Sequence, residues 1–206
     1  MAETGAPAAD GLGKVPAFTE DPWTRVESLH GLAGDELRSA LQKSIRRGLL
    51  ENALLVGYEL FQTGLEAERL LWERLEIIAV EDVGFGRPDA PVIVDVLHRM
   101  HGQFAWPSGD RFIFAAHAIR LLVTSPKDRT TDELANWVRH LADDEGVRPE
   151  IPDVALDVHT KRGQLMGRGL AHFFAEGARV ANEVPGRDLT YRKRLLALYG
   201  ISEDKA

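Results

Sequence analysis

The sequence predicts an all-α protein, and three observations support that prediction. Apolar residues recur every three or four positions between residues 35 and 142, which is the spacing of one face of a helix. The segments with this spacing end at Gly or at a Ser-Pro pair, residues that typically stop helices. No alternating apolar and polar run marks a β-strand between them.

Four helices are expected first, each with its own apolar stripe. The first follows Asp35, which we expect to cap it, and ends at Gly48. The second precedes Gly64, the third ends near Gly84, and the fourth begins after Pro88. Their stripes are Leu37, Leu41 and Ile45; Leu54, Tyr58 and Phe61; Leu71, Leu75 and Ile78; and Val92, Ile93, Val96, Leu97 and Met100.

Two more helices of this region begin at recognisable caps. Ser108 is expected to cap the fifth helix, which ends at Ser125-Pro126. Thr130 and Glu133 have the spacing of a capping box at the start of the sixth. The stripes are Phe112, Ile113, Ala116, Ile119 and Val123 in the fifth helix, and Leu134, Trp137, Val138 and Leu141 in the sixth. Because the connections are short, we expect neighbouring helices to pack antiparallel in pairs.

The chain divides by composition into three parts. Residues 1–22 combine Ala, Gly and Pro with few large apolar groups, and we expect them to be disordered. Residues 23–144 are expected to form the helical domain. Residues 145–206 are expected to contain an extended segment followed by a C-terminal helical arm, with helices over 170–183 and 190–199.

Composition excludes several classes of protein. The absence of cysteine excludes disulfides and thiolate-bound zinc. No apolar run approaches the roughly 20 residues of a membrane span, and the first residues lack the basic-then-apolar order of an export signal. No Gly-x4-Gly-Lys-Ser/Thr loop for a nucleotide phosphate and no Gly-x-Ser-x-Gly nucleophile elbow occurs. We therefore expect a soluble cytoplasmic protein without ATPase activity of its own.

The net charge of −7 is unevenly distributed. Residues 35–156 carry 14 basic and 21 acidic side chains, whereas residues 157–199 carry 8 basic and 4 acidic ones. Most of this surface would repel a phosphate backbone, and only the C-terminal third would attract one. Autonomous DNA binding is therefore expected to be weak or absent.

Three short runs carry a resemblance to a known family. Residues 39–46 read Ser-Ala-Leu-Gln-Lys-Ser-Ile-Arg, residues 79–84 read Ala-Val-Glu-Asp-Val-Gly with Pro88 beyond them, and residues 125–128 read Ser-Pro-Lys-Asp. In order and spacing they resemble the C-terminal helical collar of the RarA/MgsA family of clamp-loader-like AAA+ ATPases. In that family the collar is all-helical and assembles subunits into a homotetramer, and the attached ATPase acts at stalled replication forks.

The resemblance implies a clamp-loader-collar-like helical bundle with a C-terminal helical arm and without the ATPase module. It further implies a homo-oligomer, by resemblance a tetramer, that acts as a scaffold in DNA replication or repair beside a RarA-like ATPase or replication proteins. One departure concerns nucleic acid. The family's Arg-Arg-Leu-x-Arg run is here Glu73-Arg74-Leu75-Glu76-Ile77, so two basic groups are replaced. Because the ATPase module is absent, we expect a non-catalytic protein with no cofactor.

Charged residues in two of these runs predict an ion-pair network. Glu81 and Asp82 lie near the end of a helix, where carboxylates oppose the negative end of the helix dipole unless they are paired. Lys43 and Arg46 on the first helix are the expected partners. We interpret the four residues as a structural network that locks two helices, in preference to a catalytic pair.

A basic, glycine-rich segment at 159–169 suggests an alternative function. Lys161, Arg162 and Arg168 flank glycines just ahead of a helix, and such a segment can bind a phosphate or a nucleic-acid backbone. In the other interpretation, the glycines allow the arm to pack closely and the cations pair with acidic surface. A nucleic-acid or phosphate-binding module therefore stays open as an alternative.

Four residues supply potential metal ligands in the same region. Asp157 and His159 are two apart, and His172 and Glu176 have the i, i+4 spacing of one helix face. A metal-dependent enzyme is therefore a further alternative. Because the His-Glu-x-x-His sequence of helical zinc proteases is absent, we expect no metal site, and we interpret His98 and His101 as residues that favour a helix end.

Overall fold

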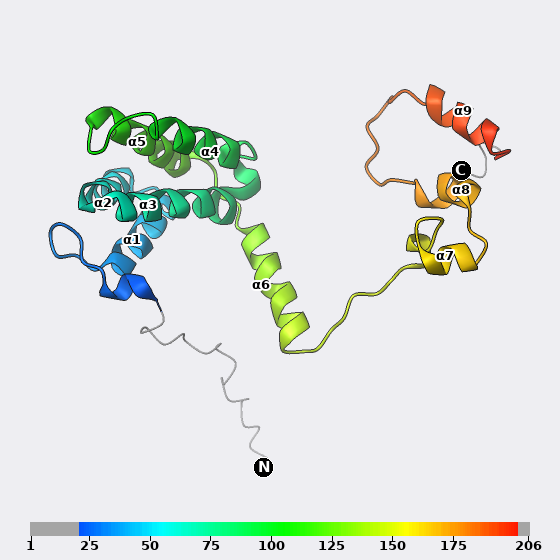
Figure 1. The fold of residues 1–206 in the computed structure, drawn as a ribbon, viewed down its shortest axis with the longest axis horizontal. Helices are drawn as coiled ribbons and strands as arrows, with labels where there is room; N and C mark the ends of the chain where they lie inside the picture. Colours follow the sequence, from blue (N-terminus) through cyan, green and yellow to red (C-terminus); the bar gives the residue numbers. More distant parts are fainter. Residues whose placement is uncertain (1–20, 202–206) are drawn as a thin grey trace, which may run out of the picture. The chain divides into compact units, whose positions relative to one another are not determined.

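The computed structural model describes residues 21–201, and within them it contains helices and turns but no β-strand. The all-α prediction is confirmed. The chain divides into two compact units, Met1–Asp144 and Glu145–Ala206, which run from blue to yellow-green and from yellow to red in Figure 1. Most of the expected disordered tail lies outside the described residues.

The first described residues belong to the helical unit. Asp21 accepts a hydrogen bond from the Trp23 backbone N–H at 3.0 Å and so starts a short 3₁₀ helix, Pro22–Arg25. Its carboxylate pairs with the guanidinium of Arg38, and this hydrogen bond lowers the pKa of Asp21. Asp21 and Pro22 are therefore structured, although the prediction placed them in the tail.

The first unit contains six α-helices among its described residues. They are α1 (Gly34–Arg46), α2 (Leu50–Thr63), α3 (Leu65–Ile78), α4 (Ala90–His101), α5 (Gly109–Thr124) and α6 (Thr130–Asp143). All six correspond to predicted helices. Helices α1 to α5 pack against one another, whereas α6 extends away from them and contacts the turn that follows α3 (Figure 1).

Helix α3 lies at the centre of the bundle and contacts α1, α2, α4 and α5. Its predicted stripe of Leu71, Leu75 and Ile78 has no exposed surface, and Trp72 beside it is equally buried. The stripe of α1 is also buried as predicted. The rest of the core is formed by Leu37, Leu41, Ile45, Ala53, Val56, Leu60, Ala67, Leu70, Ala79, Val83, Ala90, Val94, Ala115, Ala118, Ile119, Leu122 and Val123.

Helix α2 buries Phe61 and partly buries Leu54 as predicted, but it also turns small residues to the core that were not predicted. Tyr58 is 42% exposed, and the buried face includes Ala53, Gly57 and Leu60. The reason is the close approach of α5: a Cβ atom at Gly57 would lie 2.5 Å from Cδ1 of Ile119. Small residues on α2 therefore define the contact, which a search for large apolar residues does not detect.

Helix α4 is apolar on two sides, and most of the predicted stripe lies on the side that faces away from the core. Val92, Val96 and Met100 are exposed, whereas Ala90 and Val94 are buried. The buried side is fixed because the imidazole rings of α4 contact α3, as described below. In α5, Ile119 and Val123 are buried as predicted, but Ile113 is exposed.

Two of the three predicted N-caps are wrong. Helix α1 begins after Ala33, which provides no side-chain cap, and Asp35 lies in the first turn, where its charge favours the helix dipole. Thr130 does not cap α6; its backbone N–H instead donates to Oδ1 of Asp128 at 3.0 Å. Ser108 does cap α5, because its hydroxyl accepts a hydrogen bond from the Arg111 N–H.

The second unit contains α7 (Lys161–Leu165), α8 (Leu170–His172) and α9 (Thr190–Leu198) among its described residues. The predicted extended segment contains one short 3₁₀ turn at Asp153–Ala155, and α9 ends before Gly200 as predicted. The helix expected over 170–183 is too long. After α8 the chain forms one π turn, Phe173–Gly177, and then runs irregularly past Asn182, which has a positive φ of 55°.

Leu75→Ala should destabilise the first unit by about 2–5 kcal/mol, because it removes buried methyl groups and leaves a cavity. The matched control is Leu55→Ala, since Leu55 on α2 is 68% exposed; its effect should stay within about 0.5 kcal/mol. Urea unfolding followed by circular dichroism measures both values. Equal effects of the two substitutions would contradict the core described here.

Candidate functional site

The three runs that carry the family resemblance meet at one place. The Asp128 backbone N–H donates to the carbonyl oxygens of Asp82 at 3.0 Å and Val83 at 3.2 Å. Glycines permit this approach: a Cβ atom at Gly84 would lie 2.4 Å from the Asp128 carbonyl oxygen, and one at Gly86 would lie 2.5 Å from that of Pro126. Gly84 also has a φ of 49°, which side chains rarely adopt. Residues 79–86 are thus joined to residues 125–128 through their backbones.

The side chain of Asp82 lies at the centre of the contact between these three runs, which we call the Asp82 junction. It has no exposed surface. Its carboxylate accepts hydrogen bonds from Arg46, from Nη1 of Arg129 at 2.8 Å and from Nε2 of Gln42 at 3.0 Å. Two guanidinium groups and one amide therefore surround a single buried carboxylate. Such a carboxylate is tolerated inside a protein only because it is paired and hydrogen-bonded.

Glu81 adds a second carboxylate at the edge of the junction. It accepts from Nη2 of Arg46 at 3.0 Å and from Nη1 of Arg129 at 3.2 Å. Lys43, which was predicted to belong to this network, instead contacts the hydroxyl of Ser39. The structure thus brings Arg46, Glu81 and Asp82 together and replaces Lys43 by Arg129. We call Gln42, Arg46, Glu81, Asp82 and Arg129 the Asp82 network.

The Asp82 network connects three elements that are distant in the sequence. Arg46 lies at the end of α1, Asp82 in the π turn Ala79–Val83 after α3, and Arg129 directly before α6. Arg129 also pairs with Asp132 in the first turn of α6. Partial burial alone would lower the pKa of Arg129, but the hydrogen bonds that Arg129 donates to Asp82 and Glu81 outweigh this effect and raise it. The network therefore fixes the position of the first residues of α6 through charged hydrogen bonds.

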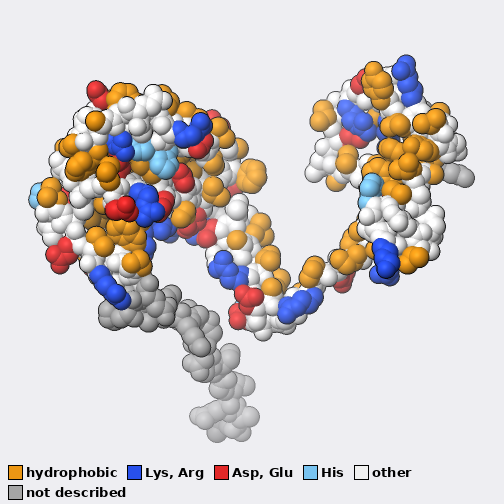
Figure 2. Space-filling view, viewed as in Figure 1, with side chains coloured by type: hydrophobic (Ala, Val, Ile, Leu, Met, Phe, Trp, Pro, Cys, Tyr) orange, Lys and Arg blue, Asp and Glu red, His pale blue; other side chains and the backbone are white. Residues whose placement is uncertain are grey.

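Helix α6 presents an apolar face that the described residues of the first unit do not cover. Leu134, Trp137 and Val138 are all more than half exposed, and no residue of this helix is buried. Most of the predicted stripe of α6 therefore lies at the surface of the first unit. A groove beside the helix is lined by Ile77, Val80 and Ala135 together with polar residues. Figure 2 shows hydrophobic side chains at the surface of this part of the first unit.

A second buried polar cluster joins α3, α4 and α5, and sequence reasoning did not identify it. Glu68 is almost fully buried and accepts from Nε of Arg111 at 2.8 Å and from its Nη2 at 2.8 Å. Arg111 Nη2 also lies 3.2 Å from Nε2 of His101. Trp72 stacks on both histidine rings, with centroids 4.9 Å from His98 and 4.8 Å from His101. Figure 2 shows histidine side chains gathered on this unit beside charged ones.

The surroundings of His101 favour its neutral form. Its Nδ1 contacts the carbonyl oxygen of His98, so Nδ1 carries a proton and donates it. Its Nε2 faces a guanidinium of Arg111, which has only donors, so Nε2 accepts. Burial lowers the pKa of His101, and the Arg111 charge acts in the same direction against the opposing effect of Glu68. His98 pairs with Glu76 at 2.7 Å at the edge of this cluster.

The three cations of the basic segment 159–169 differ in their contacts. Both Nη atoms of Arg168 are hydrogen-bonded: Nη1 donates to the Asp153 and Leu156 carbonyl oxygens at 2.8 and 2.9 Å, and Nη2 donates to the Asp153 carboxylate. Lys161 and Arg162 are exposed. Gly163 packs against Asp157 so closely that a Cβ atom would lie 2.0 Å from its carbonyl oxygen. This geometry supports the packing interpretation of the segment.

The four potential metal ligands are held in separate contacts. The Asp157 carboxylate accepts from the His159 backbone N–H at 2.9 Å and contacts its ring, which lowers the pKa of Asp157. Glu176 pairs with Arg179 at 3.4 Å, and Nδ1 of His172 is buried without a partner. Within residues 21–201, no three His, Asp or Glu side chains are grouped so that they could hold a metal ion.

No family model matches the sequence, and no curated protein shows significant similarity to it. Within residues 21–201, none of the helices combines the length and apolar character that crossing a lipid bilayer requires.

Asp82→Asn should destabilise the first unit by about 3 kcal/mol, the lower end of the range for breaking a buried pair, because the two arginines lose a charged partner but remain partly solvated. The control is Glu66→Gln, which breaks the exposed pair with Arg69 and should cost less than about 0.5 kcal/mol. Chemical denaturation at pH 7 measures both. A loss below 1 kcal/mol for Asp82→Asn would contradict a structural role for the network.

The lowered pKa of His101 predicts a pH dependence of stability. Between the lowered pKa of His101 in the folded chain and its ordinary value of about 6.5, the unfolded chain binds a proton that the folded chain does not, so the free energy of unfolding should fall as the pH is lowered through this window. His101→Asn should flatten this slope, whereas His117→Asn should not, because His117 is exposed. Urea titrations at several pH values test this. Equal slopes in wild type and His101→Asn would show that His101 is not responsible.

Proposed function

We propose that this protein is a non-catalytic scaffold whose copies associate through the apolar face of α6. The observation that carries the proposal is the exposure of Leu134, Trp137 and Val138 on a helix that the Asp82 network anchors at its start. A 14-residue helix is marginal in water on its own and gains its stability by burying an apolar face. Here that face has no cover among the described residues of the first unit.

A second copy of the chain fits this surface better than an unrelated partner. The groove lined by Ile77, Val80 and Ala135 borders α6 itself, so a twofold pair can place the helix of each copy against the groove of the other. In such a symmetric interface each residue contacts the equivalent surface of the partner. Trp137 supplies the large aromatic anchor that often contributes most to binding.

The family resemblance extends this proposal to assembly and pathway. The three runs that resemble the RarA/MgsA collar are the ones that form the Asp82 junction, so they lie where α6 is attached. By that resemblance we propose a clamp-loader-collar-like arrangement, a homotetramer, and a role in DNA replication or repair beside an ATPase of that family. The excess of acidic side chains in residues 35–156 argues against direct DNA binding by this region.

Val138→Glu should convert the oligomer into monomers, because it places a charge in the centre of the apolar face. The matched control is Asn136→Glu, which introduces the same charge on the polar side of α6, where Asn136 hydrogen-bonds Asp132; it should leave the oligomer intact. Sedimentation velocity at tens of micromolar distinguishes these outcomes.

Salt provides a second readout of the same association. Each copy carries a charge of −7, so raising the NaCl concentration should strengthen an apolar contact between copies by screening their repulsion. A wild-type protein that stays monomeric at tens of micromolar, in low and high salt, would rule out the proposed scaffold.

A further inference from the structure

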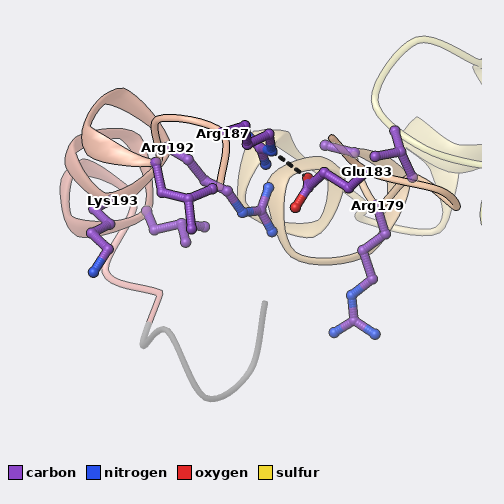
Figure 3. Close-up of a pocket in the computed structure, with 9 residues that line it drawn as sticks. Arg179, Glu183, Arg187, Arg192 and Lys193 are labelled. Atoms are coloured by element: carbon purple, nitrogen blue, oxygen red, sulfur yellow. Dashed lines mark ion pairs between the residues drawn. The ribbon is translucent and has the colours of Figure 1, made fainter. Parts of the chain in front are cut away.

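The second unit contains a charged hollow that none of the sequence motifs indicated. It is lined by Arg179, Glu183, Arg187, Arg192 and Lys193 with apolar residues between them, and it lies between the irregular segment 178–189 and the start of α9. Figure 3 shows that Arg187 and Arg192 extend toward Glu183, whereas Lys193 and Arg179 point away from it. The charged centre of the hollow is therefore formed by two arginines and one glutamate.

The two central arginines differ in their pairing. Nε of Arg187 lies 2.5 Å from Oε1 of Glu183, so these two charges compensate each other. Arg192 is half-buried, and among the described residues its guanidinium makes no hydrogen bond or ion pair. A partly desolvated guanidinium offers several N–H donors in a planar fork. Of the charges at the centre of the hollow, that of Arg192 is thus the one that no ion pair among the described residues neutralises.

An apolar hollow adjoins the charged one and shares Glu183, Arg187 and Arg192 with it. Its further lining includes Phe174 and Leu195. Phe174 is held by stacking on Tyr199, with ring centroids 5.2 Å apart. A ligand that reaches Arg192 can therefore rest an apolar or aromatic body on this surface at the same time.

We propose that the paired hollows bind a monocarboxylate that carries an apolar body. The carboxylate would form two parallel hydrogen bonds with the guanidinium fork of Arg192 and would neutralise the charge of that side chain. Glu183 selects against dianions such as phosphate esters, because their second charge would be held close to its carboxylate. The apolar body would cover Phe174 and Leu195.

The position of Arg192 is fixed by the local fold. Asp188 accepts a hydrogen bond at 2.8 Å from the Thr190 N–H and thereby starts α9. Arg192 then lies in the first turn of that helix, where a cation is unfavourable beside the positive end of the helix dipole. A bound carboxylate relieves this repulsion. The free chain therefore holds a cation at a position that an anionic ligand stabilises.

The test is an NMR titration of the full chain with three probes that share a phenyl ring and differ in the charge of the polar group. These are 4-phenylbutyrate, its neutral amide 4-phenylbutyramide, and the dianion phenyl phosphate. We expect 4-phenylbutyrate to bind most tightly. Arg192→Gln should weaken its affinity by about ten- to a hundredfold, the usual range for a hydrogen bond to a charged group, and Arg192→Lys should lose less because the charge remains.

Two further variants complete the experiment. Arg162→Gln removes an exposed cation outside the hollow and should leave binding unchanged. Glu183→Gln should increase the affinity for phenyl phosphate. The proposal is overturned if 4-phenylbutyrate does not shift resonances of the residues that line the hollows, if Arg192→Gln binds it like the wild type, or if phenyl phosphate or the amide binds the wild type more tightly.

Discussion

A single buried carboxylate organises the first unit. Asp82 has no exposed surface and is held by Arg46, Arg129 and Gln42. Because an unpaired charge at this position would be very unfavourable, the folded first unit requires all three partners to contact Asp82. Two of them come from α1, and the third lies directly before α6. The carboxylate therefore fixes where the chain leaves the bundle and where α6 begins.

This arrangement explains how a helix can extend from the bundle with its apolar side uncovered. The start of α6 is held by charges and by the backbone contact of Asp128 with Asp82 and Val83, not by burial of Leu134, Trp137 or Val138. Polar contacts of this kind set orientation more than they add stability. In the proposed scaffold, the polar contacts orient α6 and its apolar face is left for association between copies.

The sequence predicted which segments are helical better than it predicted which side chains of each helix contact the rest of the protein. Leu71, Leu75 and Ile78 were correctly placed in the core because their spacing is regular and their side chains are large. The buried faces of α2 and α4 were found only in part, because Gly57 and Ala90 mark them by small size and close approach. Arg46, Glu81 and Asp82 were grouped from their charges, but Arg129 and the Glu68–Arg111–His101 cluster depend on tertiary packing that periodicity does not encode.

The most direct measurement concerns Arg129, which belongs to the Asp82 network but not to the apolar face of α6. If the network presents that face, Arg129→Gln should leave Leu134, Trp137 and Val138 unchanged and still weaken self-association, by about tenfold or more for the loss of charged hydrogen bonds. Sedimentation equilibrium of wild type and Arg129→Gln gives both dissociation constants. Equal constants for two folded proteins would contradict the link between the buried carboxylate and assembly.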